Sequence, residues 1–141
     1  SRFAEAVFNY QADLLELPWH AISRGLAIRP SPSGLHPAAR DALMMRGISP
    51  QYTSFEKKPL TTRDLQGADR AIGIKESEHR PLMRLYFPEW VERVEYWSSN
   101  GISARGTLGQ LEHQVNELIA DLAHEYSSSP AACPEQKRDR A

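Results

Sequence analysis

The chain begins with Ser1-Arg2-Phe3-Ala4-Glu5-Ala6-Val7-Phe8. Apolar residues in this stretch recur three and four positions apart, and Leu14 and Leu15 continue the pattern. This spacing is typical of one face of an α-helix. The sequence therefore predicts a helix over residues 2–16, which Pro18 prevents from continuing.

Short apolar runs alternate with helical patterns along the rest of the chain. Strands are expected at 21–27, 71–74 and 91–97, and helices at 36–46, 76–86 and from Thr107 onward. Thr61 and Asp64 have the spacing of a capping pair that opens a short helical turn. Strands that alternate with helices indicate an α/β fold built on a parallel sheet.

The last helix has the clearest pattern. Its apolar stripe comprises Leu108, Leu111, Val115, Leu118, Ile119 and Leu122. A Thr107–Gln110 pair is expected to cap its start, and Pro81 is compatible with the preceding helix only within its first turn. Ser, Pro, Ala and charged residues dominate 127–141, so we expect one domain over 1–126 and a disordered tail over 127–141.

Composition excludes several classes of function. The 141 residues carry a formal net charge of −1, which predicts no attraction to nucleic acid or to an anionic membrane. No apolar run is long enough to span a bilayer. Cys133 is the single cysteine, which rules out an intrachain disulfide and a cysteine-rich zinc site, and the five histidines form no metal-binding pair. We therefore expect a cytoplasmic protein without a metal site.

Four stretches, taken in order and with their spacing, carry a resemblance to a known family. They are 1–6 (SRFAEA), 23–25 (SRG), 46–48 with 60–69 (RGI, LTTRDLQGAD), and 79–82, 87–90 and 95–97 (HRPL, FPEW, EYW). Together they resemble the low-molecular-weight protein tyrosine phosphatase family, from Ser1 to about Glu125. The resemblance implies a three-layer α/β sandwich around a small parallel sheet in the order 2-1-3-4.

The resemblance also implies a chemistry. In this family a Cys-x5-Arg-Ser loop binds the phosphate of a phosphotyrosine protein or a small phosphomonoester, and a thiolate attacks the phosphorus. Ser1 matches the Ser that closes the loop, so the Cys and the Arg would lie upstream of residue 1. Ser23 matches a residue that braces the loop, and Tyr96 and Trp97 are expected to line the cleft. The reaction needs no metal and no cofactor.

Two departures from the family pattern predict that the chain is inactive as it stands. Cys133 lies in the expected tail, far from any such loop. The position of the general acid, an Asp in the family, is occupied by Ser98, Ser99, Asn100 and Gly101, and no Asp occurs between Asp69 and Asp121. The alternatives are a truncated enzyme and a non-catalytic pseudophosphatase that acts as an interaction module. An arsenate reductase is disfavoured because it needs several redox cysteines.

The first, central strand of the family sheet has no counterpart in the sequence. Its absence predicts a gap between the strands at about 21–27 and 70–75, with unpaired backbone groups on both sides. We expect low stability for the isolated chain, unless upstream residues, a strand supplied in trans or a rearranged packing fills the gap. Of these, N-terminal truncation of a longer product is the favoured interpretation.

Overall fold

The structure is a computed structural model that describes residues 2–26, 36–53, 57–98, 104–128 and 139–140. The helices are α1 (Arg2–Leu14), α2 (Pro37–Met45), α3 (Thr62–Gly67), α4 (Glu76–Tyr86) and α5 (Ala104–Ser128). The strands are β1 (Arg70–Gly73), β2 (Glu95–Tyr96) and β3 (Asp139–Arg140), and two short 3-10 turns are η1 (Pro50–Tyr52) and η2 (Val91–Arg93).

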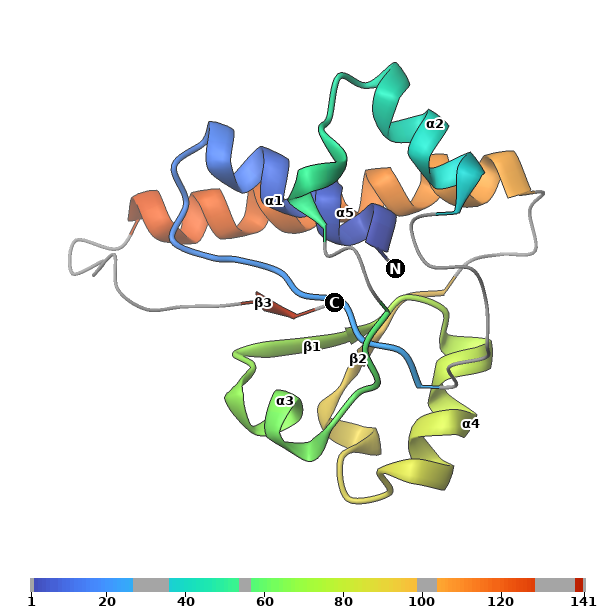
Figure 1. Cartoon of the computed structure of the whole chain (residues 1–141). Coiled ribbons are helices and arrows are strands. Elements are labelled where there is room, and N and C mark those ends of the chain that lie inside the picture. Colours follow the sequence, from blue (N-terminus) through green and yellow to red (C-terminus); the bar gives the residue numbers. More distant parts are fainter. Residues whose placement is uncertain (1, 27–35, 54–56, 99–103, 129–138, 141) are drawn as a thin grey trace.

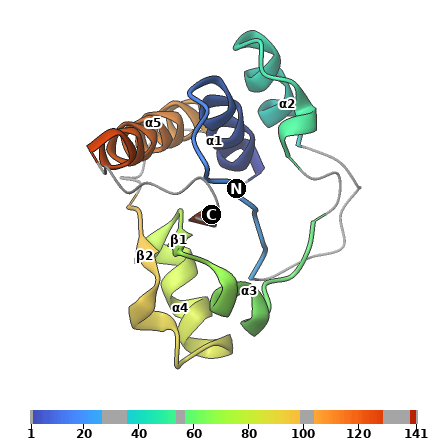
Figure 2. The ribbon, with the colours of Figure 1, turned by 90° about the vertical axis from the view of Figure 1, so that its left-hand side faces the viewer.

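The elements form three layers (Figure 1). The middle layer is a parallel sheet in the order β2-β1-β3. Helices α1, α2 and α5 lie on one side of the sheet, and α3 and α4 lie on the other, an arrangement that a view from the side also shows (Figure 2). The expected α/β sandwich around a small parallel sheet is therefore confirmed.

The main core lies between α1 and α5. Phe3, Val7 and Phe8 of α1 are each at most 2% exposed. The predicted stripe on α5 supplies the facing surface, with Leu111, Val115, Leu118, Ile119 and Leu122 all buried. A second, smaller cluster on the other side of the sheet contains Leu65, Met83 and Val91. The helical periodicity read from the sequence therefore identified the main core correctly.

The expected strand at 21–27 is wrong for the described residues 21–26, since this segment is extended but only Gly25 forms a bridge, to Pro59. Gly25 exchanges backbone hydrogen bonds with Lys58 and Leu60 at 2.9 Å each. Ala21 instead pairs with the side chain of Asn9. Local partners thus satisfy these backbone groups without a strand ladder.

The expected strand at 91–97 is shorter than predicted. Its first half is the turn η2, which backbone bonds from Trp90 to Phe87 and from Arg93 to Trp90 hold in a tight curve. Of residues 91–97, only those of β2 pair with β1. Residues 91–97 are rich in β-forming types, as the sequence indicated. The hydrogen bonds of the turn nevertheless outweigh the intrinsic preference of these residues for a strand.

Two helix details differ from the sequence predictions, and one agrees with them. Pro81 lies in the sixth position of α4, beyond the first turn, where it cannot donate the backbone bond to the carbonyl of Ser77. Helix α5 begins at Ala104, so Thr107 lies within the helix and does not cap it. Thr61 and Asp64, by contrast, form the predicted capping box at the start of α3.

The C-terminal region differs from the expected tail at both described ends. Ser127 and Ser128 belong to α5, and Asp139 and Arg140 form β3 against β1. The pairing with β1 has a simple physical reason. The edge of a strand offers unpaired backbone groups that any extended segment can bond, whatever its side chains.

Candidate functional site

One face of α1 carries a polar ladder, which we define as Glu5, Asn9 and Asp13. These residues are four positions apart, so they project from the same face of the helix. Asn9 donates to the carbonyls of Ala21 at 3.0 Å and Tyr52 at 3.1 Å, and its own carbonyl accepts the backbone N–H of Ala21 at 2.8 Å. Asp13 accepts the hydroxyl of Tyr52 at 2.8 Å. The polar ladder therefore holds the segments that contain Ala21 and Tyr52 against α1.

Glu5 is the innermost member of the ladder. Its side chain is 4% exposed, and its Oε1 accepts the hydroxyls of Ser23, at 3.0 Å, and Thr53. Position in the first turn of α1 favours a carboxylate, because the positive end of the helix dipole lies there. Ser23, predicted to brace a phosphate-binding loop, thus braces the extended segment 21–26 against α1. Its predicted role in a loop stays a prediction.

Sequence reasoning missed Glu5 and Thr53 as members of this cluster. A signal for Glu5 existed, because it lies among the apolar residues Phe3, Ala4, Ala6, Val7 and Phe8, and a charged side chain in such a helix needs a partner when it is buried. No comparable signal marked Thr53. It lies 48 residues from Glu5 and meets it only through the fold.

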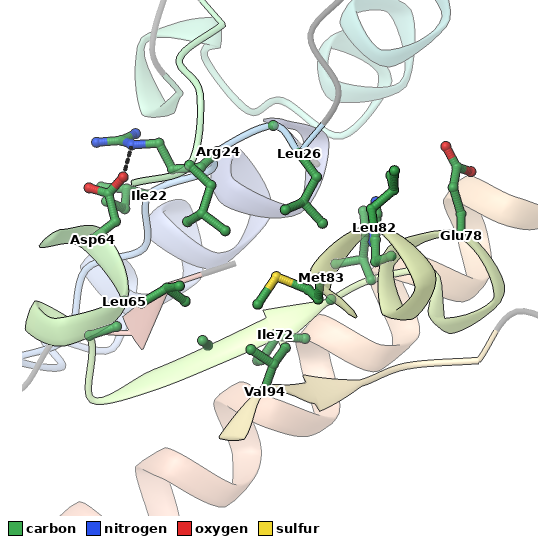
Figure 3. A pocket seen from close by; sticks show the side chains of 17 residues that line it. Ile22, Arg24, Leu26, Asp64, Leu65, Ile72, Glu78, Leu82, Met83 and Val94 are labelled. Atoms are coloured by element: carbon green, nitrogen blue, oxygen red, sulfur yellow. Dashed lines mark hydrogen bonds and ion pairs between the residues drawn. The ribbon is translucent and has the colours of Figure 1, made fainter. Parts of the chain in front are cut away.

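A cavity of about 200 Å³ lies on the opposite side of the sheet from α1 (Figure 3). Segment 22–26, β1, α3 and α4 form its walls. Apolar side chains dominate the lining, among them Ile22, Leu26, Leu65, Ile72, Met83 and Val94. The sequence predicted a gap of unpaired backbone groups beside β1, but β3 pairs with Arg70 and Ala71 of this strand.

Charged groups lie at two ends of this cavity (Figure 3). At one end, Arg24 Nε donates to Asp64 Oδ2 at 3.2 Å. At the other end is Glu78, and His79 is a further lining residue. Burial lowers the pKa of His79 below its usual value, and the adjacent Lys75 lowers it further, against the opposing effect of Glu78. Its Nδ1 accepts the backbone N–H of Lys75 at 3.2 Å, an arrangement that suits the neutral imidazole.

The structure places Tyr96 in the smaller apolar cluster. Its hydroxyl donates to the carbonyl of Val91 at 2.8 Å, and the Arg80 guanidinium lies 4.4 Å from the ring centre. Burial raises the pKa of Tyr96. A Cβ at Gly73 would lie 2.9 Å from the Tyr96 ring, so this close contact requires glycine.

Trp97 packs against the main core, and its backbone N–H donates to Gly73 at 2.8 Å. Neither Tyr96 nor Trp97 is among the residues that line the cavity. Their expected place in a substrate cleft stays a prediction.

The other sequence-predicted site residues contribute little to the described site. Ser98 is exposed, whereas Ser1, Ser99 to Gly101 and Cys133 lie outside the described residues. Within the described part of the chain, no three His, Cys, Asp or Glu side chains gather as metal ligands would. In the same part, no helix combines the length and apolarity that crossing a membrane requires.

Comparison with known proteins supports the fold. No family model matches the chain, and no curated protein does. Among solved structures, it is similar to a low molecular weight protein tyrosine phosphatase from T. tengcongensis, with 23% identity and a TM-score of 0.68. The match covers 86% of this chain and 90% of that one. Three layers, a parallel sheet and this structural match together show that the chain has the fold of a low molecular weight protein tyrosine phosphatase.

Proposed function

We propose that this protein is a relative of the low-molecular-weight protein tyrosine phosphatases, and that residues 1–141 do not hydrolyse phosphotyrosine. The observation that carries the proposal is the lack of any Asp between Asp69 and Asp121. The family chemistry needs an acid at the position that 98–101 matches, because the leaving phenolate must be protonated. Removing a general acid costs about 10²–10⁴ in rate.

The nearest carboxylates on either side of 98–101 are poor substitutes. Glu95 accepts two hydrogen bonds from Arg70, at 2.8 and 2.6 Å, and these bonds lower its pKa. Glu112 accepts two from Arg46, at 2.6 and 3.0 Å. A general acid must hold its proton near neutral pH, whereas the lowered pKa of Glu95 favours its ionised form. Both carboxylate oxygens of Glu112 are already engaged by Arg46.

The lack of a suitable nucleophile supports the same conclusion. Cys133 is the single cysteine, and no Arg follows it at the spacing of a phosphate-binding loop.

The alternative function is a non-catalytic pseudophosphatase that acts as an interaction module. The apolar cavity beside β1 favours this candidate, since concave apolar sites with a few polar groups are typical of binding sites. A phosphotyrosine protein or a small phosphomonoester is the ligand class that the fold suggests.

Hydrolysis assays test the proposal directly. We expect the purified chain to hydrolyse neither phosphotyrosine nor p-nitrophenyl phosphate above the buffer rate. Cys133→Ser is the matched control. Turnover that this substitution abolishes would overturn the proposal.

A second assay separates the lost nucleophile from the lost acid. A designed strand followed by a Cys-x5-Arg loop is joined ahead of Ser1. We expect the extended protein to hydrolyse p-nitrophenyl phosphate, which has a good leaving group, and phosphotyrosine about 10²–10⁴ times more slowly. Equal rates on the two substrates would show that the reaction needs no acid at positions 98–101.

A further inference from the structure

We propose that His79 makes the start of α4 sensitive to pH: its neutral imidazole holds this end of the helix against β1 and β2, and protonation of the imidazole releases it. The proposal goes beyond catalysis, because it concerns a change of conformation and involves no phosphate. We call the backbone contacts that join Lys75 and Glu76 to Gly73 and Trp97 the α4 junction.

The first observation is the hydrogen bond that the imidazole makes at the start of the helix. Lys75 occupies the N-cap position of α4, and its side chain makes no capping bond. His79 Nδ1 accepts the backbone N–H of Lys75 at 3.2 Å instead. A protonated imidazole carries hydrogen on both nitrogens and cannot accept this bond. It would also place a positive charge near the positive end of the helix dipole. Protonation therefore replaces an attraction with a repulsion.

The second observation is that this end of α4 is bonded to the ends of two strands. The backbone N–H of Glu76 donates to the carbonyl of Trp97 at 2.9 Å, and the N–H of Trp97 donates to the carbonyl of Gly73 at 2.8 Å. Gly73 ends β1, and Trp97 directly follows β2. A Cβ at Gly73 would lie 3.3 Å from the Cβ of His79, so the histidine packs directly on the end of β1. Displacement of His79 therefore disturbs the α4 junction.

The third observation concerns the groups that surround the imidazole. His79 is half-buried and lines the cavity beside β1. Burial is the largest cause that lowers its pKa, and the charges of Lys75 and of the amino terminus act in the same direction. Glu78, also on α4, opposes them. On the other walls of the cavity, Arg24 and Asp64 neutralise each other in an ion pair of 3.2 Å (Figure 3). The surroundings therefore favour the neutral imidazole.

The direction of the pH effect follows from this preference. A histidine in an unfolded chain has a pKa of about 6.5. Because the pKa of His79 is lower in the fold, its contribution is fully present above about pH 6.5 and is lost as the pH falls through the folded pKa. Opening of the α4 junction exposes His79 to water and lets it take up a proton. We expect the equilibrium constant for this opening to rise about five- to tenfold between about pH 7.5 and about pH 5.5.

Hydrogen exchange of the full chain, followed by NMR at these two pH values, tests the proposal. Exchange rates are corrected for the intrinsic effect of pH, so that the protection of each amide is compared. Protection of the Lys75 and Glu76 amides should fall about five- to tenfold in acid. His79→Gln keeps an acceptor oxygen but takes up no proton in this range, so it should remove the fall.

His36→Gln is the matched control. His36 Nδ1 accepts the backbone N–H of Ala38 at 3.1 Å, so this histidine makes a similar bond at the start of α2. Its substitution should leave the pH dependence of the Lys75 and Glu76 amides unchanged. The amide of Val115, buried in the main core, serves as the reference for global unfolding, and it should be better protected than these two amides at both pH values.

Titration of the His79 ring by NMR gives a second measurement, which needs no substitution and replaces the first if His79→Gln fails to fold. The imidazole should titrate below pH 6.5, and its neutral form should carry the hydrogen on Nε2. Acetylation of the amino terminus removes one of the charges that lower the pKa. The titration should stay below pH 6.5, because burial is the largest cause.

Four outcomes would overturn the proposal. The first is titration of His79 at or above pH 6.5. The second is a fall in protection that persists in His79→Gln, and the third is a fall that His36→Gln abolishes. The fourth is equal protection of Val115, Lys75 and Glu76 at both pH values, which would assign the effect to unfolding of the whole chain.

Discussion

Glu5 is the residue whose removal tests the polar ladder most sharply. Glu5→Ala leaves the buried hydroxyl of Ser23 and that of Thr53 without their acceptor. Since each unpaired buried polar group costs about 1–3 kcal/mol, we expect the free energy of unfolding to fall by about 3 kcal/mol in urea titrations. Glu5→Gln keeps an acceptor oxygen, so it should lower the free energy of unfolding by less. Asp13→Ala, at an exposed rung, is the control, and a loss equal to that of Glu5→Ala would contradict the role assigned to burial.

Glu95 provides a prediction about pH. The hydrogen bonds from Arg70 lower the pKa of Glu95 below its unfolded value, despite burial. The pair therefore stabilises the fold above the unfolded Glu pKa of about 4.3, and the contribution is lost as the pH falls through the folded pKa. The side chains are 34% and 46% exposed, so solvent screens the pair. We expect Glu95→Gln to destabilise by less than about 1 kcal/mol at pH 7 and to match the unsubstituted chain in acid.

Urea titrations at several pH values measure this difference. Glu92→Gln is a suitable control, because its single contact with Arg80 is longer, at 3.4 Å, and more exposed. A difference for Glu95→Gln that grows as the pH falls would contradict the assigned direction.

At the scale of the element, α4 contains an unfavourable residue. Pro81 is exposed and lies inside the helix, where it removes a backbone donor. Pro81→Ala restores that donor without loss of packing, so we expect a gain of about 3 kcal/mol in the free energy of unfolding. Pro88→Ala is the control, because Pro88 is exposed and lies outside the helices, and it should give no gain. Equal effects would show that the helix tolerates Pro81 without cost.

The elements also show how far local pattern determines structure. Helices α1, α2, α4 and α5 and strand β1 lie where periodicity placed them, because burial of an apolar face dominates their stability. The segments at 21–27 and 91–97 were less predictable. Strand residues need a neighbouring strand, and the sequence does not say which backbone groups are within reach.

For the whole molecule, we expect low stability. Among the described residues, β3 pairs with β1 at Arg70 and Ala71, and the cavity beside β1 leaves its lining without full packing. We therefore expect a broad thermal transition of the isolated chain in circular dichroism. A sharp cooperative transition would contradict this prediction.

The amino-acid sequence by itself determined the helices, the main core, the α/β class and the inventory of chemical groups. The helices and the core follow from periodicity, which is a local property, as in the apolar stripe on α5. The chemical groups follow from composition, which can be counted, as in the lack of an Asp between Asp69 and Asp121. Only the tertiary structure decided that Ser23 and Thr53 both donate hydrogen bonds to Glu5, and that Asp139 of β3 is the strand partner of Arg70 in β1. The physical reason is that strand edges and buried hydroxyl groups form hydrogen bonds with the groups that the fold places near them. A local sequence pattern does not encode which groups these are.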